Sequence, residues 1–313
     1  MRTEAHTTPL DLSAPAGPAP QSHGRSAGLA AVRRHGDRMP IAIIIALSFL
    51  GFVAALGLLA DVLAPFGYDE QDLALRLQPP ALLGGPAGHW LGTDEIGRDV
   101  LSRLLFSIRM SLTTALIGTM VAACIGTVIG FVAARFGGLV DEALMMLVDA
   151  QASMPFFILA LAALAFLGNS LLLFCLLLGL HGWEVYARVV RGLVLATQSL
   201  PHVEAVRLLG AGPLRLYARH VLPAIAGVLV VKVTLNFPGT ILLESGLSFL
   251  GLGVQPPLTS LGLMLGAGRE YLLFAWWIAV VPGATIFLTT LSVSLVGDWL
   301  RDRLDPQLRH ERR

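Results

Sequence analysis

The chain has 313 residues, of which 55% are hydrophobic and 14% are charged, and its mean hydropathy is +0.72. Soluble domains carry about 25% charged residues, so this composition excludes an ordinary soluble protein and indicates a polytopic membrane protein. The formal net charge is only +1, and the two cysteines, Cys124 and Cys175, both lie in apolar runs, which excludes a disulfide framework or a zinc site.

The N-terminal segment 1–38 is rich in Ala, Pro, Gly and Ser. We expect a flexible cytoplasmic tail there, because such a segment buries too little apolar surface to order itself. The apolar segment 39–64 is too long for a signal-peptide core and predicts a first transmembrane helix. Further apolar runs, each close to the ~20 residues that a spanning helix needs, predict five more spans. They lie near 109–135, 142–167, 169–190, 224–247 and 274–298, and Pro155 predicts a kink in the third span.

The arginines indicate the orientation, because cytoplasmic segments of membrane proteins carry an excess of basic residues. With the N-terminus in the cytoplasm, sixteen arginines fall in cytoplasmic segments and five in outer ones. Both termini are therefore predicted to be cytoplasmic, with a C-terminal tail over 299–313. The segment 203–223 falls on the same side.

An extracytoplasmic loop is expected over 65–108, and its stretch HWLGTDEIGRDVLSRLLFSIR carries a helix signal. Thr93 is predicted to be the N-cap, with two acidic residues in the first turn. Val100, Leu104 and Ile108 share one apolar stripe, which predicts an amphipathic helix along the outer membrane face. The alternative is the frayed start of the second span.

Small residues recur every four positions along the second span, at Gly118, Ala122, Gly126, Gly130 and Ala134. Such a ladder lets another helix approach closely and is typical of a packed transmembrane bundle.

The segment VEAVRLLGAGPLRLYARHVLP, residues 203–223, is polar although it lies between two strongly apolar runs. It predicts a short helix over 204–209, a break at 210–213 and a second helix over 214–221, with Pro223 at the start of the fifth span. A break made of small residues allows another protein to come close. The alternative is an ordinary loop between spans.

Several enzyme classes are excluded by missing motifs. Neither HExxH nor GxSxG occurs, and the only lysine, Lys232, follows no glycine-rich loop. The chain therefore has no Walker-type ATP site, and a membrane-embedded enzyme is disfavoured. Any energy for transport has to come from a partner protein or an ion gradient.

The segment 203–223 also resembles the EAA motif of ABC importer permeases. In that motif EAA is followed by three residues, a glycine, nine residues, an apolar residue, one further residue and then LP. Glu204, Ala205, Gly210 and Leu222-Pro223 match. Two positions depart: Val206 replaces the last alanine, and His220 replaces the apolar residue, as in the peptide and nickel importer branch.

Four other stretches resemble the second permease subunit of dipeptide, oligopeptide and nickel importers. They are LGTDEIGRDVLSRLL (91–105), FGGLVDEALMMLVD (136–149), GLSFLGLGVQPP (246–257) and LVGDWLRDRLDPQLR (295–309). The similarity as a whole extends over about 39–309.

The resemblance implies an all-α polytopic membrane protein with about six transmembrane helices and the type I ABC importer transmembrane fold, whose transmembrane domain is 109–298. It implies a non-catalytic permease in the bacterial inner membrane that carries peptides or a related small solute such as nickel. The chain itself would hold no cofactor or metal, because ATP and Mg bind to partner subunits. The implied partners are a homologous second permease, two ABC ATPase subunits, an extracytoplasmic solute-binding protein and membrane lipid, but not nucleic acid.

Two sets of site residues follow. By position in the motif, contact with the ATPase is expected at Glu204, Ala205, Gly210, Ala211, His220, Leu222 and Pro223. Polar residues deep in the spans are candidates for the translocation path, namely Lys232, Asn236, Glu244, Asp149 and Gln151. His181, Trp183 and Tyr186 could also face a pore, or equally could be interface anchors.

Lys232 lies roughly 13 Å into the fifth span, at about 1.5 Å per residue from Pro223. A charge at that depth is costly unless it faces the bundle interior or water, so Lys232 could attract an anionic group of the substrate. The alternatives are snorkelling to the cytoplasm or pairing with Asp149. For Asp149 itself, an interhelical hydrogen bond is the alternative to substrate contact. The runner-up function is a gradient-driven secondary transporter with Lys232, Glu244 and Asp149 as coupling charges.

Overall fold

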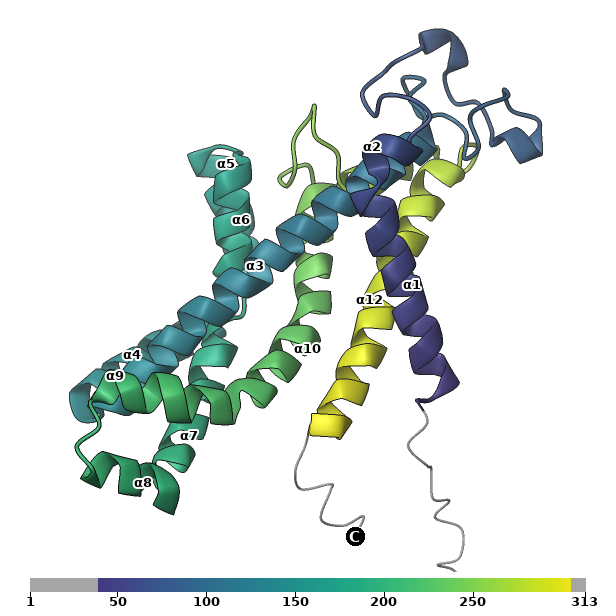
Figure 1. The fold of residues 1–313 in the computed structure, drawn as a ribbon. Coiled ribbons are helices and arrows are strands. Elements are labelled where there is room, and N and C mark those ends of the chain that lie inside the picture. The colour runs from purple at the N-terminus through teal and green to yellow at the C-terminus, as the bar shows by residue number, and fades with distance from the viewer. Residues whose placement is uncertain (1–38, 305–313) are drawn as a thin grey trace, which may run out of the picture. The chain divides into compact units, whose positions relative to one another are not determined.

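The computed structural model describes residues 39–304, which form helices joined by loops, with one isolated β-bridge between Thr93 and Asp99 (Figure 1). The expected tail 1–38 and residues 305–313 lie outside the described residues. The α-helices in chain order are α1 (Ile41–Leu58), α2 (Ala60–Leu63), α3 (Val100–Phe136), α4 (Gly138–Ser153), α5 (Phe156–Leu167), α6 (Leu171–Gly179), α7 (Trp183–Gln198), α8 (Pro201–Leu208), α9 (Pro213–Leu216), α10 (Leu222–Phe249), α11 (Leu261–Gly268) and α12 (Trp277–Leu304). Short 3-10 turns at Leu73–Leu75, Ala81–Leu83 and Arg269–Tyr271 and a π-helical turn at Tyr217–Val221 complete the set.

Within the described residues, five helical segments are long and apolar enough to cross a membrane: α1, α3, Leu171–Gln198, Tyr217–Phe249 and α12. A sixth span results if α4 and α5 are counted together, although they are bent by 85° at their junction. The kink predicted at Pro155 is therefore confirmed. It arises because proline cannot donate a backbone hydrogen bond and crowds the preceding turn.

The fourth span extends further than the predicted 169–190. It is interrupted between α6 and α7 and continues to Gln198. Arg188 and Arg191 lower the apparent hydrophobicity of α7, which hid this continuation in the sequence. Both arginines bind a carboxylate of α4: Arg188 binds Asp149 at 2.7 Å and Arg191 binds Asp141 at 2.5 Å.

The amphipathic helix expected before the second span is not a separate element. Val100, Leu104 and Ile108 belong to the first turns of the continuous helix α3, where they are buried against α11 and α12. The N-cap is Asp99 instead of Thr93, because its carboxylate accepts a hydrogen bond from the Ser102 backbone N–H at 2.7 Å. The frayed-start alternative is thus closer to the structure.

The first residues of the C-terminal tail expected over 299–313 are helical. Residues 299–304 continue α12, with Trp299 and Leu300 half-buried and 301–304 exposed, and residues 305–313 lie outside the described residues. The guanidinium of Arg303 lies 5.0 Å from the ring centroid of Trp299, one turn earlier, which supports this helical continuation.

The ladder of small residues in α3 is where α6 and α7 pack closely. A Cβ atom added to Gly118 would lie 2.6 Å from Cβ of Leu178, and one added to Gly130 would lie 2.6 Å from the carbonyl oxygen of Ala187. Neither contact leaves room for a side chain, so the predicted packed bundle is confirmed.

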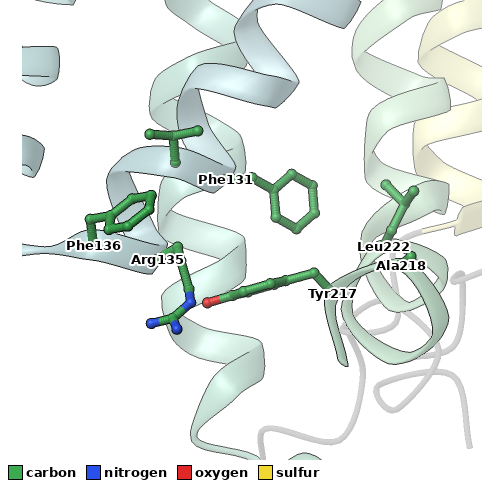
Figure 2. Close-up of a pocket in the computed structure, with 7 residues that line it drawn as sticks. Phe131, Arg135, Phe136, Tyr217, Ala218 and Leu222 are labelled. Carbon is green, nitrogen blue, oxygen red and sulfur yellow. The ribbon is translucent and has the colours of Figure 1, made fainter. Parts of the chain in front are cut away.

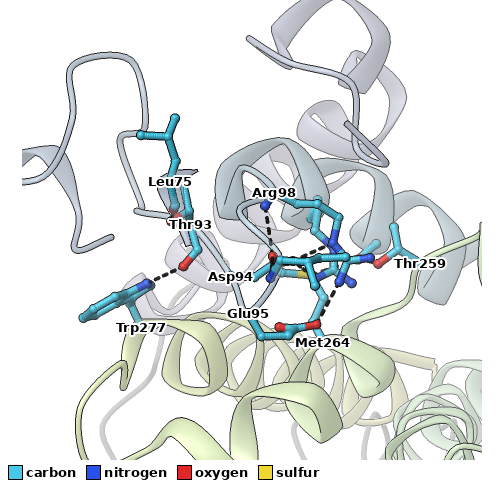
Figure 3. A network of polar contacts seen from close by, with 11 residues as sticks. Leu75, Thr93, Asp94, Glu95, Arg98, Thr259, Met264 and Trp277 are labelled. Atoms are coloured by element: carbon cyan, nitrogen blue, oxygen red, sulfur yellow. Dashed lines mark hydrogen bonds and ion pairs between the residues drawn. The ribbon is translucent and has the colours of Figure 1, made fainter. Parts of the chain in front are cut away.

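The loop between α2 and α3 is joined to the bundle by a buried network (Figure 3). The Asp94 side chain is fully buried and binds both Arg98, at 2.7 Å, and Arg103 of α3. Trp277 of α12 donates its indole N–H to the carbonyl oxygen of Thr93 at 3.1 Å. The loop is therefore fixed to two helices that lie far apart in the sequence.

Candidate functional site

The helix, break and second helix predicted for 203–223 are confirmed. α8 ends at Leu208, Gly210 turns the chain with a φ of +82°, and α9 starts at Pro213. A glycine is favoured at such a positive φ because it has no Cβ. We call residues 201–221 the α8–α9 element.

The second helix does not stop before the fifth span but continues into it through the π-helical turn Tyr217–Val221. Pro223 explains this turn, because its ring lacks an N–H and crowds the carbonyl group four residues back. The N–H of Leu222 binds the carbonyl oxygen of Tyr217, five residues back. α9 and α10 therefore form one unbroken helical run that can transmit a displacement.

One side of the α8–α9 element is fixed to the bundle by apolar packing. Val203, Leu216 and Val221 are at most 3% exposed and belong to one cluster with Val190 and Val194 of α7. Burial of each such side chain stabilises the fold by about 1.5–3 kcal/mol. The element is thus a rigid part of the bundle, which argues against an ordinary loop.

The motif residues lie on both sides of the element. Glu204, Ala205 and Gly210 are exposed, and a Cβ atom at Gly210 would meet no other atom within 4 Å. Val206, which departs from the motif, is half-buried against the apolar cluster, so its larger side chain fills space inside the element. The other motif residues are half-buried (Ala211 and His220) or exposed (Leu222 and Pro223).

Two leucines that sequence reasoning did not single out stand beside Gly210 on the exposed side. Leu208 is 82% exposed and Leu209 is 86% exposed. Adjacent large apolar side chains that stay exposed on a segment between two spans are candidates for a contact with another protein. The sequence did contain an indication of this exposed pair. Leu208 and Leu209 are adjacent at the end of a short helix, and that helix has only one buried side.

A second group of polar side chains gathers at the break between α6 and α7. Gln151 of α4 points its amide to the carbonyl oxygen of Leu180 at 3.5 Å, and the amide of Asn236 of α10 lies against Gly182. Tyr186 of α7 donates its hydroxyl to the carbonyl oxygen of Lys232 at 3.4 Å. The amide nitrogen of Asn236 is buried and has no hydrogen-bond partner in the described part of the chain.

The five path candidates do not form one cluster. Gln151, Asn236 and the backbone of Lys232 meet around the α6–α7 break, whereas Asp149 is exposed and binds Arg188. Glu244 is fully buried and accepts hydrogen bonds from Ser248 at 3.0 Å and Ser245 at 3.2 Å. Both serines belong to α10, so the buried carboxyl group is satisfied within its own helix and does not face an open space.

Comparison with known proteins decides the family. The model of the family "Binding-protein-dependent transport system inner membrane component" matches residues 126–310, more than half of the chain. The chain belongs to this family. The matched region contains the whole α8–α9 element and the α6–α7 break.

Relatives of this binding-protein-dependent permease cover nearly its full length. The di/tripeptide transport system permease protein DppC of Pseudomonas aeruginosa is 39% identical over 84% of this chain and 88% of the relative. The oligopeptide permease OppC of Mycobacterium bovis is 36% identical over 88% and 93%, and the glutathione permease GsiD of Pectobacterium atrosepticum is 34% identical over 83% and 85%. Among solved structures, inward-facing MetNI methionine ABC transporter gives a TM-score of 0.43 at 22% identity, over 63% of this chain and 95% of that chain.

The family confirms the expected fold class and role. The permease is an all-α, multi-pass component of the bacterial inner membrane and forms the transmembrane part of an ATP-driven ABC importer. It is not an enzyme, because ATP hydrolysis belongs to separate subunits of such importers, and it works with ATPase and solute-binding partners. A gradient-driven transporter is not favoured, since Glu244 is buried among hydroxyl groups and Asp149 is paired with Arg188.

Proposed function

We propose that this permease imports dipeptides or oligopeptides as one of two homologous permease subunits, driven by two ATPase subunits that bind Mg and ATP. The names of the relatives support the substrate class, since they are di/tripeptide, oligopeptide and glutathione permeases. The need for a second permease follows from size, because five or six spans rarely enclose a path for a peptide.

The observation that carries the proposal is the two-sided α8–α9 element. Val203 and Leu216 fix its inner side, whereas Glu204, Leu208, Leu209 and Gly210 are exposed on its outer side. A rigid backing with an exposed apolar pair is suited to receive force from a docked partner. We assign the ATPase contact to this outer side, and the unbroken run from α9 into α10 carries the motion to the span.

The orientation that accompanies this proposal has both termini in the cytoplasm. Arginines of α8 and α9 then lie on the cytoplasmic face, in agreement with the excess of basic residues expected there. The ATPase subunits dock on the same face. The solute-binding protein approaches from the other side, where the loop between α2 and α3 would lie.

For the translocation path we assign the polar group at the α6–α7 break, with Asn236 and Gln151 as lining residues and Lys232 beside them. The amide of Asn236 supports this assignment, because it is a buried polar group beside Tyr186 at the break between two helices, and buried polar groups are normally hydrogen-bonded. Peptides carry backbone carbonyl groups and a terminal carboxylate, which an amide and a lysine can bind.

Co-purification tests the docking proposal. The wild-type permease, expressed with the genes of its importer, is expected to retain the ATPase subunits, and the double variant Glu204→Ala, Gly210→Asp is expected to lose them. The control is Arg188→Ala. Arg188 lies in α7 outside the α8–α9 element, so this variant is expected to retain the ATPase subunits. Retention of the ATPase by the double variant at wild-type level rules the contact out.

A further inference from the structure

Two adjoining cavities lie between the end of α3 and the α8–α9 element. The first, of about 310 Å³, is lined by the side chains drawn in Figure 2 and is almost entirely apolar; we call it the apolar groove. Its lining residues are Phe131, Val132, Arg135, Phe136, Tyr217, Ala218 and Leu222.

The second cavity, of about 360 Å³, has a lining of mixed polar and apolar character that includes two arginines, and we call it the basic pocket. It is lined by Arg135, Gln198, Arg207, Ala211, Pro213, Leu216 and Tyr217. Arg135 and Tyr217 line both cavities, so that the apolar groove and the basic pocket share one wall.

The ends of three membrane spans meet at these cavities. Arg135 is in the last turn of α3, Gln198 is the last residue of α7, and Tyr217 is the first residue of the apolar segment that continues as α10. Span ends mark the level at which hydrocarbon gives way to lipid headgroups. The apolar groove therefore opens on the side of the spans, and the basic pocket lies on the side of the polar element.

The charges at the pocket are all positive. No acidic residue lines either cavity, and within residues 39–304 neither Arg135 nor Arg207 forms an ion pair with a carboxylate. Arg207 donates one N–H to the side-chain oxygen of Gln198 at 3.3 Å, and the Arg135 guanidinium lies 5.9 Å from the centroid of the Phe136 ring. The remaining N–H donors of both guanidinium groups are available for an anion.

Tyr217 adds a neutral donor at the shared wall. Its oxygen accepts a hydrogen bond from the amide of Gln198 at 2.9 Å, and its ring packs edge-on against Phe131 with centroids 5.6 Å apart. The ring is thus fixed while its hydroxyl proton can still be donated.

We propose that these cavities bind an anionic phospholipid, with the phosphate between Arg135 and Arg207 and an acyl chain along Phe131, Phe136 and Leu222. The adjoining apolar and basic surfaces match the two ends of one such molecule, and guanidinium groups recognise phosphate well. A carboxylate of a partner protein matches the charge but leaves the apolar groove empty. Basic pockets between transmembrane helices attract the negatively charged headgroups of anionic lipids.

Lipid binding to the full-length protein in its assembled transporter tests the proposal by native mass spectrometry. The probes are phosphatidylglycerol and phosphatidylcholine with identical acyl chains. We expect phosphatidylglycerol to bind wild type more tightly, and the double variant R135Q/R207Q to weaken that binding at least about tenfold, because each arginine near an anionic lipid contributes a factor of about five. Phosphatidylcholine binding should not change.

The matched control is the double variant R215Q/R219Q, which removes the same amount of charge from the α8–α9 element, to which Arg207 also belongs. Arg215 and Arg219 are exposed and line neither cavity, so phosphatidylglycerol binding should be retained. An equal loss in both double variants overturns the proposal. If R135Q/R207Q does not fold, R207Q alone is expected to weaken binding about fivefold.

Two further measurements separate the lipid from other anions. Ala218→Trp fills the apolar groove without changing charge and should weaken phosphatidylglycerol binding, whereas millimolar inorganic phosphate should not displace the lipid. Displacement by inorganic phosphate overturns the proposal in favour of a simple anion contact. These tests measure binding without transport, so their result is independent of the docking proposal.

Discussion

The carboxylate of Asp149 lies 2.7 Å from the guanidinium of Arg188, which joins α4 to α7 at an exposed position. Asp149 was one predicted partner of Lys232, but its carboxylate is paired with Arg188 instead. In the described part of the chain Lys232 forms no ion pair, while its backbone carbonyl oxygen is held by Tyr186. The lysine is therefore available to another anion.

The first prediction concerns Lys232. Lys232→Met should raise the KM for peptide uptake by about tenfold or more, because a contact with a charged group contributes about 1.5–3 kcal/mol. Lys232→Arg keeps the charge and should retain most of the uptake. Transport by proteoliposomes at several peptide concentrations measures both. Unchanged kinetics of Lys232→Met across dipeptides and oligopeptides would remove Lys232 from the path.

The second prediction separates two roles of Gly210. Gly210→Asp should abolish transport and leave the protein in the membrane, because the space around Gly210 is open in this chain and an added side chain there meets a docked partner. Gly210→Asn has a similar size and tolerates a positive φ well. If close approach of the ATPase matters, Asn should also impair coupled ATP hydrolysis. Full activity with Asn and loss with Ala would show that only the backbone conformation matters.

The third prediction concerns the exposed leucine pair. The double variant Leu208→Ser, Leu209→Ser should lose the ATPase on co-purification while the Tm changes little, since exposed substitutions usually alter stability by less than about 0.5 kcal/mol. The matched control is Leu273→Ser, because Leu273 is 98% exposed and lies outside the α8–α9 element. ATPase binding that survives in the double variant would contradict an apolar contact.

The fourth prediction compares a buried ion pair with an exposed one. Asp94→Asn removes the carboxylate that neutralises the buried guanidinium of Arg103. This change should destabilise the protein by about 3–5 kcal/mol. Asp149→Asn breaks the exposed pair with Arg188, whose side chains are 70% and 54% exposed, and should cost about 0–1 kcal/mol. Thermal unfolding of the purified variants measures both. Equal effects would mean that the loop between α2 and α3 is not fixed by this network.

Hydropathy located the spans well where apolar residues run without interruption, as in α1 and α12. It misplaced the fourth span because Arg188 and Arg191 look like a boundary until their carboxylate partners on α4 are seen. The start of α3 was missed for a related reason. Its mixed stripe reads as an interfacial helix, but α11 and α12 bury it, and these helices follow more than a hundred residues later.

The sequence by itself determined the local features, namely the break at Gly210, the kink at Pro155 and the close packing of the small residues of α3. Each depends on the backbone properties of a few neighbouring residues. Only the tertiary structure decided which polar side chains meet: it placed Asn236 and Gln151 at the α6–α7 break, buried Glu244 among serines and left Leu208 and Leu209 exposed. A helical pattern gives the face on which a side chain lies, but the neighbour of that face is set by the packing of distant helices.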